Sequence, residues 1–280
     1  MVHALSGVCK YFAVATEKEA EEVKNLCKQE ILLLCFPQNL QRAIENEICF
    51  LVTNTEQAML VANENFKKKP KAFVKFNCGM NRLGFDKFHK LGFEPYGILT
   101  HFYTNKSKIL KKQVAKFQKF CTNFSPQIPV SCKASSTIKS NIRCDIARVG
   151  YELYADSVVL KSKIVEIRQL KRGEYLGYGD KKIKKATRIA VVSCGYGDGL
   201  FRSISGKYSV KINSQSCKIV HSICMDYLFC DIANLDAKIG DEVTIIENAD
   251  DLQKMAKAAG TIGYEVLTAF SGRLDRIYID

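Results

Sequence analysis

The stretch Val191-Val192-Ser193-Cys194-Gly195-Tyr196-Gly197-Asp198-Gly199 joins an apolar run to a glycine-rich segment. The apolar run predicts a buried strand, and three glycines within five residues predict a tight, open turn. A tyrosine in such a turn has little side-chain bulk beside it. Its hydroxyl can therefore be presented at the end of a strand, where sheets and barrels place their chemistry. Taken alone, the stretch is explained equally well as a hairpin turn with a surface tyrosine.

Composition places the chain among globular proteins of one large or two smaller domains. It has 280 residues, of which 47% are hydrophobic and 25% charged. The formal net charge of +13 raises the question of nucleic acids or acidic substrates. No nucleic-acid-binding motif accompanies the basic residues, so we interpret them as a solvated lysine-rich surface rather than a nucleic-acid-binding module. The lysine groups are dispersed, at Lys67-Lys68-Lys69, Lys111-Lys112 and Lys181-Lys182.

The cysteines and the apolar runs indicate a cytoplasmic protein. Twelve cysteines are scattered without a Cys-x-x-Cys pair, which argues against a disulfide framework or a zinc site and favours a reducing cytoplasm. The start of the sequence has no charged lead followed by an apolar core. The longest apolar run, Ile31 to Phe36, is far too short to span a bilayer. We therefore expect neither export nor a membrane segment, and no bound metal.

The first part of the chain alternates apolar runs with helix-forming segments. This order predicts a parallel sheet, and the number of units favours a barrel over an open sheet. A (β/α)8 barrel has eight strands, whereas the pattern predicts seven. The predicted strands are residues 11–15, 31–36, 48–52, 72–76, 96–102, 128–132 and 146–150, the last running on to Tyr154, and the predicted helices are residues 17–24, 39–46, 55–67 and 107–124.

After about residue 160 the pattern changes to short strands separated by turns. We therefore predict two domains, an N-terminally incomplete barrel over residues 1–160 and a mainly β domain over residues 161–280. One helix is expected in the second domain, over residues 250–259. The predicted strands there are residues 158–170, 187–194, 208–212, 217–220, 227–232 and 242–246.

Polar residues stand at the ends of several predicted strands of the first domain. In a barrel, the carboxyl ends of the strands form the active-site face, so these residues would meet at one mouth. Each has a simpler explanation when taken singly. Lys75 can be a surface lysine, Arg148 a salt-bridge partner and His101 a satisfied core histidine. The residues at strand ends are Arg82, His101, Ser135, Ser136 and Arg148.

Five motifs together resemble the alanine racemase family, and they occur in that family's order over nearly the whole chain. Each motif is weak alone, but the set is specific. The stretch from Lys75 to Gly84 is similar to K-x-(D/N)-x-G-M-x-R-L-G. The stretch from Ala147 to Tyr154 is similar to V-R-x-G-x-x-x-Y, with Ala147 in place of the valine. The others are Gly195-Tyr196-Gly197-Asp198-Gly199, Cys224-Met225-Asp226, and Tyr264-Glu265 followed by Ser271 and Arg273.

The resemblance implies an isomerase that interconverts L- and D-alanine with pyridoxal phosphate, a fold-type-III enzyme that supplies D-alanine for peptidoglycan. It also implies a barrel followed by a β domain, and a head-to-tail homodimer with shared active sites. A racemase of another small amino acid such as serine, and a non-catalytic cofactor-binding or regulatory relative, stay open. An amino-acid decarboxylase of the same fold is disfavoured by the pairing of Gly-Tyr-Gly-Asp-Gly with Cys-Met-Asp.

The resemblance also implies roles for individual residues. Tyr196 would exchange a proton on one face of the substrate α-carbon, after entering the partner subunit's barrel. Arg148 would face the pyridine nitrogen and leave it unprotonated, because a guanidinium does not readily give up a proton. The carbanion would then be weakly stabilised, which suppresses side reactions. His101 would support Arg148, and a carbamylated Lys75 would orient Arg82 toward the substrate carboxylate.

The remaining implied roles concern the cofactor phosphate and the substrate carboxylate. Ser136 and the backbone amides of Gly150 and Tyr151 would hold the phosphate. The backbone amide of Met225 would share the substrate carboxylate, with Asp226 as a supporting residue.

Several positions depart from the family pattern. The chain has Cys132 and Ser135 where the family often has histidine and asparagine, and Gly272 where some members have a phosphate-binding tyrosine. The family's first strand ends in a K-A-N-A-Y-G-like stretch whose lysine forms the cofactor Schiff base, and residues 1–11 do not resemble it. The expectation from the sequence is therefore that the first strand and this lysine are missing, by truncation, a misplaced start or a real loss, and that the chain as printed is inactive.

Overall fold

The computed structural model describes residues 2–63, 65–133 and 144–279. The chain divides into two compact units, Met1–Gly150 and Tyr151–Asp280. This division lies earlier in the chain than the one predicted after residue 160. The short helix α6 (Tyr151–Tyr154) belongs to the second unit because the ring of Tyr151 packs on that of Tyr264, with ring centroids 4.9 Å apart. Among the described residues, no helix has the length and apolar character needed to cross a membrane.

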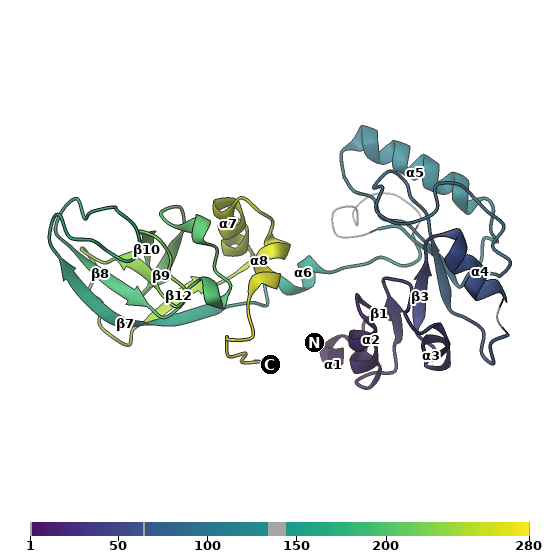
Figure 1. Cartoon of the computed structure of the whole chain (residues 1–280), viewed down its shortest axis with the longest axis horizontal. Coiled ribbons are helices and arrows are strands. Elements are labelled where there is room, and N and C mark those ends of the chain that lie inside the picture. The colour runs from purple at the N-terminus through teal and green to yellow at the C-terminus, as the bar shows by residue number, and fades with distance from the viewer. Residues whose placement is uncertain (1, 64, 134–143, 280) are drawn as a thin grey trace. The chain divides into compact units, whose positions relative to one another are not determined.

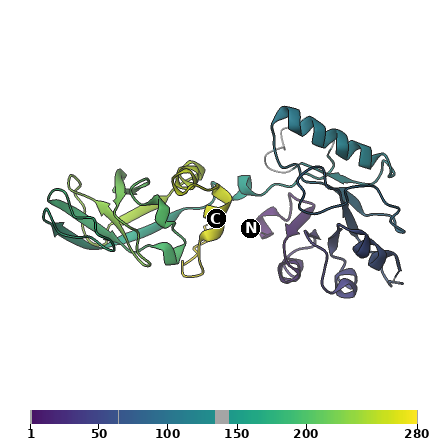
Figure 2. The ribbon, with the colours of Figure 1, turned by 45° about the horizontal axis from the view of Figure 1, so that its top comes forward.

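The first unit contains a six-stranded sheet whose strands follow one another in chain order, β1-β2-β3-β4-β5-β6, all parallel. This is the strand order of a (β/α)8-type barrel. Helices α2–α5 lie in an arc along one side of the sheet (Figures 1 and 2). The elements are α1 (Val2–Leu5), β1 (Tyr11–Val14), α2 (Glu17–Lys24), β2 (Glu30–Leu33), α3 (Leu40–Glu45), β3 (Cys49–Val52), α4 (Thr55–Asn63), β4 (Ala72–Lys75), β5 (Gly97–Leu99), α5 (Ser107–Cys121) and β6 (Val130–Ser131).

Strands β2 to β6 are buried on both faces over most of their length, which is why they form continuous apolar runs in the sequence. Alternate residues point to opposite faces. One set packs together with residues of the helices and includes Ile31, Phe50 and Val74. The other set forms a separate inner cluster of Leu32, Cys49, Leu51, Phe73 and Leu99. Helices therefore cover the outer face, while the inner face is filled by its own side chains.

The inner face is closed at the amino ends of the strands by a polar network around Glu30. Its Oε1 accepts hydrogen bonds from Lys71 Nζ at 2.9 Å and from the Tyr96 hydroxyl at 2.7 Å. These bonds lower the pKa of the Glu30 carboxyl, although burial acts in the opposite direction. The pKa of the neighbouring Tyr11 hydroxyl is raised by burial and by the charge of Glu30. This network lies at the opposite end of the strands from Lys75, the last residue of β4.

The prediction of a seventh strand at residues 146–150, running on to Tyr154, is wrong. Both Asp145 and Ile146 donate their backbone N–H to the same carbonyl, that of Val130, at 2.9 and 3.1 Å. A regular parallel ladder spaces its bonds evenly along both strands, so this doubled contact interrupts it. The segment runs beside β6 without forming a strand, and the chain then turns into α6.

The second unit contains a closed six-stranded antiparallel barrel with the order β10-β11-β8-β7-β12-β9. Its interior forms a continuous apolar cluster to which the helices that follow the barrel also contribute. Asn213 and Ser214, with φ of 49° and 63°, form the two-residue turn between β9 and β10. The elements are β7 (Leu160–Leu170), β8 (Thr187–Val192), the 3₁₀ turns η2 (Tyr196–Asp198) and η3 (Arg202–Ile204), β9 (Ser209–Ile212), β10 (Gln215–Val220), β11 (Leu228–Asp231), β12 (Glu242–Ile246), α7 (Ala249–Ala259) and α8 (Gly263–Ala269).

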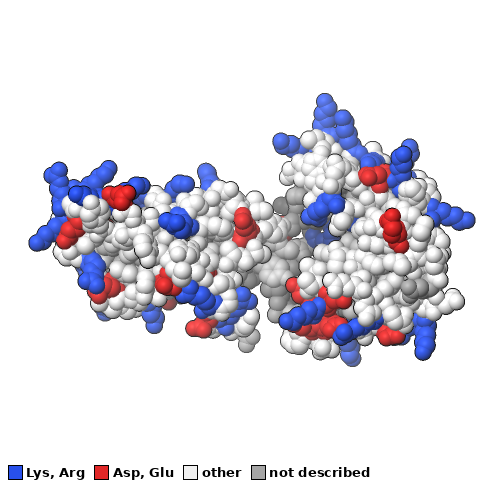
Figure 3. Space-filling model, in the orientation of Figure 1, with Lys and Arg blue, Asp and Glu red and all other residues white. Residues whose placement is uncertain are grey.

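Lysine and arginine side chains are scattered over the visible face of both units, with aspartate and glutamate among them (Figure 3). Many of the ion pairs are solvent-exposed, such as Lys18–Glu22 and Lys161–Glu242. Such pairs contribute little stability, of the order of 0–1 kcal/mol each. This distribution agrees with the interpretation of the basic residues as a solvated surface.

Candidate functional site

The carboxyl ends of β4, β5 and β6 carry three of the predicted site residues. Lys75 ends β4 and is buried, with 6% of its surface exposed. His101 follows β5 and is partly buried. Arg148 contacts Ser131, the last residue of β6. Because side chains alternate along a strand, Lys75 takes the same inner face as Phe73. The structure thus brings Lys75, His101 and Arg148 to one end of the inner face.

Arg148 is held by backbone and side-chain acceptors from two neighbouring strand ends. Its Nη2 donates to the carbonyl oxygen of Thr100 at 2.8 Å and lies 3.4 Å from Nδ1 of His101. Its Nη1 donates to the carbonyl oxygen of Ser131 at 3.2 Å and also to the Ser131 hydroxyl. Thr100 and Ser131 were not predicted as site residues. Their position at strand ends beside predicted residues is the signal that could have found them.

The charges at this end of the sheet shift one another's ionisation. Burial, and then the positive charges of Arg148, Arg82 and Lys75, lower the pKa of His101 to about 4. Burial, and then the charges of Arg82 and Arg148, lower the pKa of Lys75 to about 8. His101 is therefore neutral at pH 7, so its ring can accept a hydrogen bond from Arg148. Among the described residues, no carboxylate forms an ion pair with Lys75, Arg82 or Arg148.

Arg82 lies in an exposed loop after β4 that is tied back by Asn77. The Oδ1 atom of Asn77 accepts the backbone N–H groups of Gly79 and Asn81, both at 3.0 Å. Its Nδ2 donates to Asp86 at 2.7 Å. In this chain Asn77 uses both functions of its amide, since its oxygen accepts and its nitrogen donates. The sequence did not identify Asn77 as a site residue.

Gly84 closes the same loop. Its φ is +118°, and a Cβ there would lie 2.8 Å from the backbone carbon of Phe76. Only glycine fits such a close approach at positive φ. The loop that carries Arg82 is thus fixed at both ends. The positive charge of Arg82 contributes to lowering the pKa of both Lys75 and His101.

In the second unit, Tyr196 begins the 3₁₀ turn η2, which follows the end of β8 after residues 193–195. Its side chain is 40% exposed. The predicted tight turn is confirmed. Gly195 is required there because a Cβ would overlap the carbonyl oxygens of Cys224 and Met225. Gly199 has a φ of +111°. The sequence Gly-Tyr-Gly-Asp-Gly therefore presents a tyrosine from a closely packed backbone.

Met225 and Asp226 lie beside this turn. Met225 is 51% exposed, and its carbonyl oxygen accepts the N–H of Gly197 at 2.9 Å. Asp226 accepts a hydrogen bond from Arg273 Nη2 at 2.6 Å. The structure thus brings Tyr196, Met225 and Asp226 together within the second unit.

The predicted phosphate-binding residues are only partly described. Gly150 ends the first unit, and a Cβ placed on it would meet nothing within 4 Å. Tyr151 begins α6, and its hydroxyl accepts a hydrogen bond from Gln253 Nε2 at 2.6 Å. Ser136 and Ser135 lie outside the described residues.

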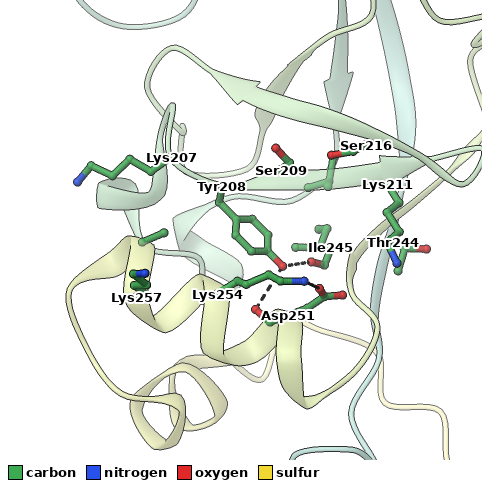
Figure 4. A pocket seen from close by; sticks show the side chains of 12 residues that line it. Lys207, Tyr208, Ser209, Lys211, Ser216, Thr244, Ile245, Asp251, Lys254 and Lys257 are labelled. Carbon is green, nitrogen blue, oxygen red and sulfur yellow. Dashed lines mark hydrogen bonds and ion pairs between the residues drawn. The ribbon is translucent and has the colours of Figure 1, made fainter.

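A recess of about 540 Å³ lies elsewhere in the second unit, between the barrel and α7. Figure 4 shows the hydroxyl of Tyr208 directed at the carbonyl of Ile245, to which it donates at 2.7 Å. Lys254, in the same view, is paired with Asp251 at 3.2 Å. Lys211, another lining residue, pairs with Glu247. The predicted site residues that the structure describes do not line this recess, and we assign it no function.

The fold and these residues define a class of protein. It is a two-unit protein with a parallel α/β barrel sheet that carries a cationic cluster at its carboxyl end, and an antiparallel β barrel that presents a tyrosine. The chain matches the family models of the alanine racemase N-terminal domain over residues 1–158 and the alanine racemase C-terminal domain over residues 157–278.

Individual relatives agree with this match. The chain is 30% identical to an alanine racemase of Helicobacter pylori strain Shi470, over 96% of this chain and 85% of the relative. It is 31% identical to an alanine racemase of Clostridium perfringens strain SM101, over 95% and 81%. A crystal structure of alanine racemase from Bartonella henselae with covalently bound pyridoxal phosphate superposes with a TM-score of 0.88, at 27% identity over 99% of this chain and 87% of the other. The chain belongs to the alanine racemase family.

Proposed function

We propose that this protein is a pyridoxal phosphate-dependent racemase that interconverts L- and D-alanine. The observation that carries the proposal is the pair of guanidinium groups of Arg82 and Arg148, which lie near Lys75 at the carboxyl end of the sheet. These groups have no ion pair with a described carboxylate, so the cluster suits a ligand that brings its own negative charge. An amino-acid carboxylate and a phosphate cofactor both do so.

The N–H groups of the cluster are hydrogen-bond donors, and these suit the acceptor atoms of the cofactor. When bound, pyridoxal phosphate supplies a ring that withdraws electrons from the amino acid and so acidifies its α-C–H. Arg148 would face the ring nitrogen. Its guanidinium stays protonated at neutral pH, so it cannot accept a proton and offers the nitrogen a hydrogen bond only. His101, neutral at pH 7, would accept an N–H of Arg148 and keep the guanidinium in place.

The phosphate group would be held by residues near the end of the first unit. We assign this role to Ser136, which lies outside the described residues, and to the backbone amides of Gly150 and Tyr151. The open space around Gly150 supports the assignment, because an anion can approach that backbone closely.

Tyr196 would hold and move the proton on one face of the substrate α-carbon. A tyrosine hydroxyl is a general acid or base when it is placed within hydrogen-bond reach of the reacting atom. Its exposed side chain on a rigid turn supports this role.

The substrate carboxylate would bind Arg82 and the backbone amide of Met225, with Asp226 as a support. Lys75 would orient Arg82 as a carbamate, formed when its neutral amine adds carbon dioxide and loses a proton. The lowered pKa of Lys75, about 8, favours the neutral amine that this reaction requires.

We further propose that the protein acts as a homodimer in the cytoplasm and supplies D-alanine for the cell wall. The dimer is supported by the location of Arg148 and Tyr196 on separate units of the chain, since one complete site needs both. The cytoplasm is supported by the twelve cysteines, which are scattered without a Cys-x-x-Cys pair.

The test is racemisation by the holoenzyme of the chain preceded by the family's K-A-N-A-Y-G-like first strand, followed as loss of optical rotation from L-alanine and from D-alanine. Tyr196→Phe should lower turnover by about a hundredfold to ten-thousandfold, the usual contribution of a general acid or base. The two directions should also respond differently to solvent deuterium, because Tyr196 serves one face only.

Tyr178→Phe is the matched control, since Tyr178 is a 74% exposed tyrosine of the same unit. It should leave turnover unchanged. Unchanged turnover in Tyr196→Phe would reject the assigned role. Faster racemisation of serine than of alanine would identify serine as the substrate in place of alanine. Absence of any racemisation would reject the function.

A further inference from the structure

The turn that carries Tyr196 is fixed to a neighbouring segment by its backbone. The N–H of Tyr196 donates to the carbonyl of Cys224 at 3.0 Å, and the N–H of Gly197 donates to that of Met225 at 2.9 Å. By contrast, no described residue forms a hydrogen bond with the side chain of Tyr196. The position of its hydroxyl therefore depends on how rigidly the backbone of the turn is held.

Arg273 contacts this turn from the C-terminal segment. Its Nη2 donates to Asp226 Oδ1 at 2.6 Å, and its Nε lies 3.5 Å from Asp198 Oδ1. A Cβ at Gly197 would overlap Nη1 of Arg273. The guanidinium thus lies directly against the residue that follows Tyr196, and it bridges carboxylates from both segments.

Asp198 transmits this contact to the start of the turn. Its Oδ2 accepts the N–H of Gly195 at 2.8 Å, while its Oδ1 faces Arg273. The Asp198 side chain is only 12% exposed. A carboxylate so placed needs a cation, because burying an unpaired charge is costly. Arg273 supplies that charge, and its planar fork presents Nη2 to Asp226 and Nε to Asp198 in a fixed geometry.

The C-terminal segment is itself anchored to the turn. The N–H of Ser271 donates to the carbonyl of Asp198 at 3.3 Å, and the N–H of Arg273 donates to the Ser271 hydroxyl at 3.2 Å. A Cβ at Gly199 would overlap the carbonyl oxygen of Ala269. Arg273 therefore approaches from a backbone that has little freedom to move.

We propose that Arg273 is a positioning residue that holds Tyr196 in place for proton transfer by bridging Asp198 and Asp226. The inference rests on the proposed racemase function. Arg273 acts only through the turn, so it should govern the rate of the chemical step rather than the binding of substrate.

The experiment compares Arg273→Gln and Arg273→Lys with the wild type, each as the holoenzyme that carries the family's first strand ahead of residue 1. Misplacing a catalytic group by about 1 Å costs on the order of a hundredfold in rate. We expect Arg273→Gln to lower kcat tenfold to a hundredfold with KM for alanine changed less than about threefold. Arg273→Lys should recover part of kcat, because a lysine keeps the positive charge but lacks the rigid planar fork.

A second readout does not depend on activity. Amide hydrogen exchange of peptides covering residues 194–201 should become faster in Arg273→Gln and stay nearly normal in Arg273→Lys. Arg172→Gln is the matched control, an exposed arginine of the same unit with no ion pair to a described residue, and it should change neither readout. If Arg273→Gln does not fold, Asp226→Asn removes one arm of the same bridge and should give the same pattern more weakly.

The two proposals fail in different ways. If the wild type does not racemise alanine, the proposed function fails whatever Arg273 does. If Tyr196→Phe leaves turnover unchanged, the role of Tyr196 fails, and Arg273 then has no proton-transfer group to position. If Tyr196→Phe lowers turnover but folded Arg273→Gln keeps normal kcat and normal exchange, the positioning role is overturned. A rise in KM alone would also overturn it, because that result would place Arg273 in substrate binding.

Discussion

At the scale of single residues, the proposed site depends on a histidine that stays neutral beside an arginine. Burial and three nearby cations lower the pKa of His101 to about 4, so the folded protein binds this proton less readily than the unfolded chain, whose histidines titrate near 6.5. The stability that neutral His101 contributes is present above pH 6.5 and is lost as the pH falls through 4. Urea titrations measure the free energy of unfolding of the wild type and of His101→Gln at each pH. The wild-type value relative to the variant should fall by about 1–2 kcal/mol between pH 7 and pH 4, with allowance for solvent screening of the partly exposed ring.

A direct NMR titration checks the same prediction. The ring of His101 should show no protonation between pH 8 and pH 5.5. A His101 resonance that titrates near pH 6.5 would contradict it and would also remove the ring as an acceptor for Arg148.

At the scale of elements, the packing of Phe73 on the inner face of the sheet depends on one glycine. A Cβ at Gly97, the first residue of β5, would overlap the ring of Phe73 from β4. Both residues are buried within the sheet. Forcing extra atoms into a packed core costs about 1–3 kcal/mol. Gly97→Ala should therefore lower the free energy of unfolding by that amount, whereas Gly7→Ala, at an exposed position with nothing within 4 Å, should change it by less than about 0.5 kcal/mol. Equal effects of the two substitutions would show that Phe73 can move aside.

The elements also show where sequence reasoning succeeds. The helix predicted over residues 17–24 is confirmed as α2, because Thr16 and Glu19 form a capping box whose signal is local. The strand predicted at residues 146–150 is wrong, because an apolar run does not reveal that two of its amides share one acceptor. Helix α8 was not predicted, since it begins at Gly263 and has no side-chain cap. The contacts of Arg148 with Thr100 and Ser131 join residues far apart in sequence, so local patterns could not disclose them.

At the scale of the whole molecule, the proposed site joins residues of two units, and mixing two variants can test whether they come from two subunits. Arg82→Gln alters the first unit at an exposed residue, so folding should be preserved, and Tyr196→Phe alters the second. Each variant alone should be nearly inactive. If one site takes Arg82 from one subunit and Tyr196 from its partner, a mixed dimer holds one doubly altered site and one intact site. Refolding an equal mixture should then restore about a quarter of wild-type activity, because half of the dimers are mixed and each has one working site of two.

If each subunit used its own Arg82 and Tyr196, every site in the mixture would carry one defect and no activity would return. Sedimentation of the wild type as a monomer at micromolar concentration would contradict the dimer itself.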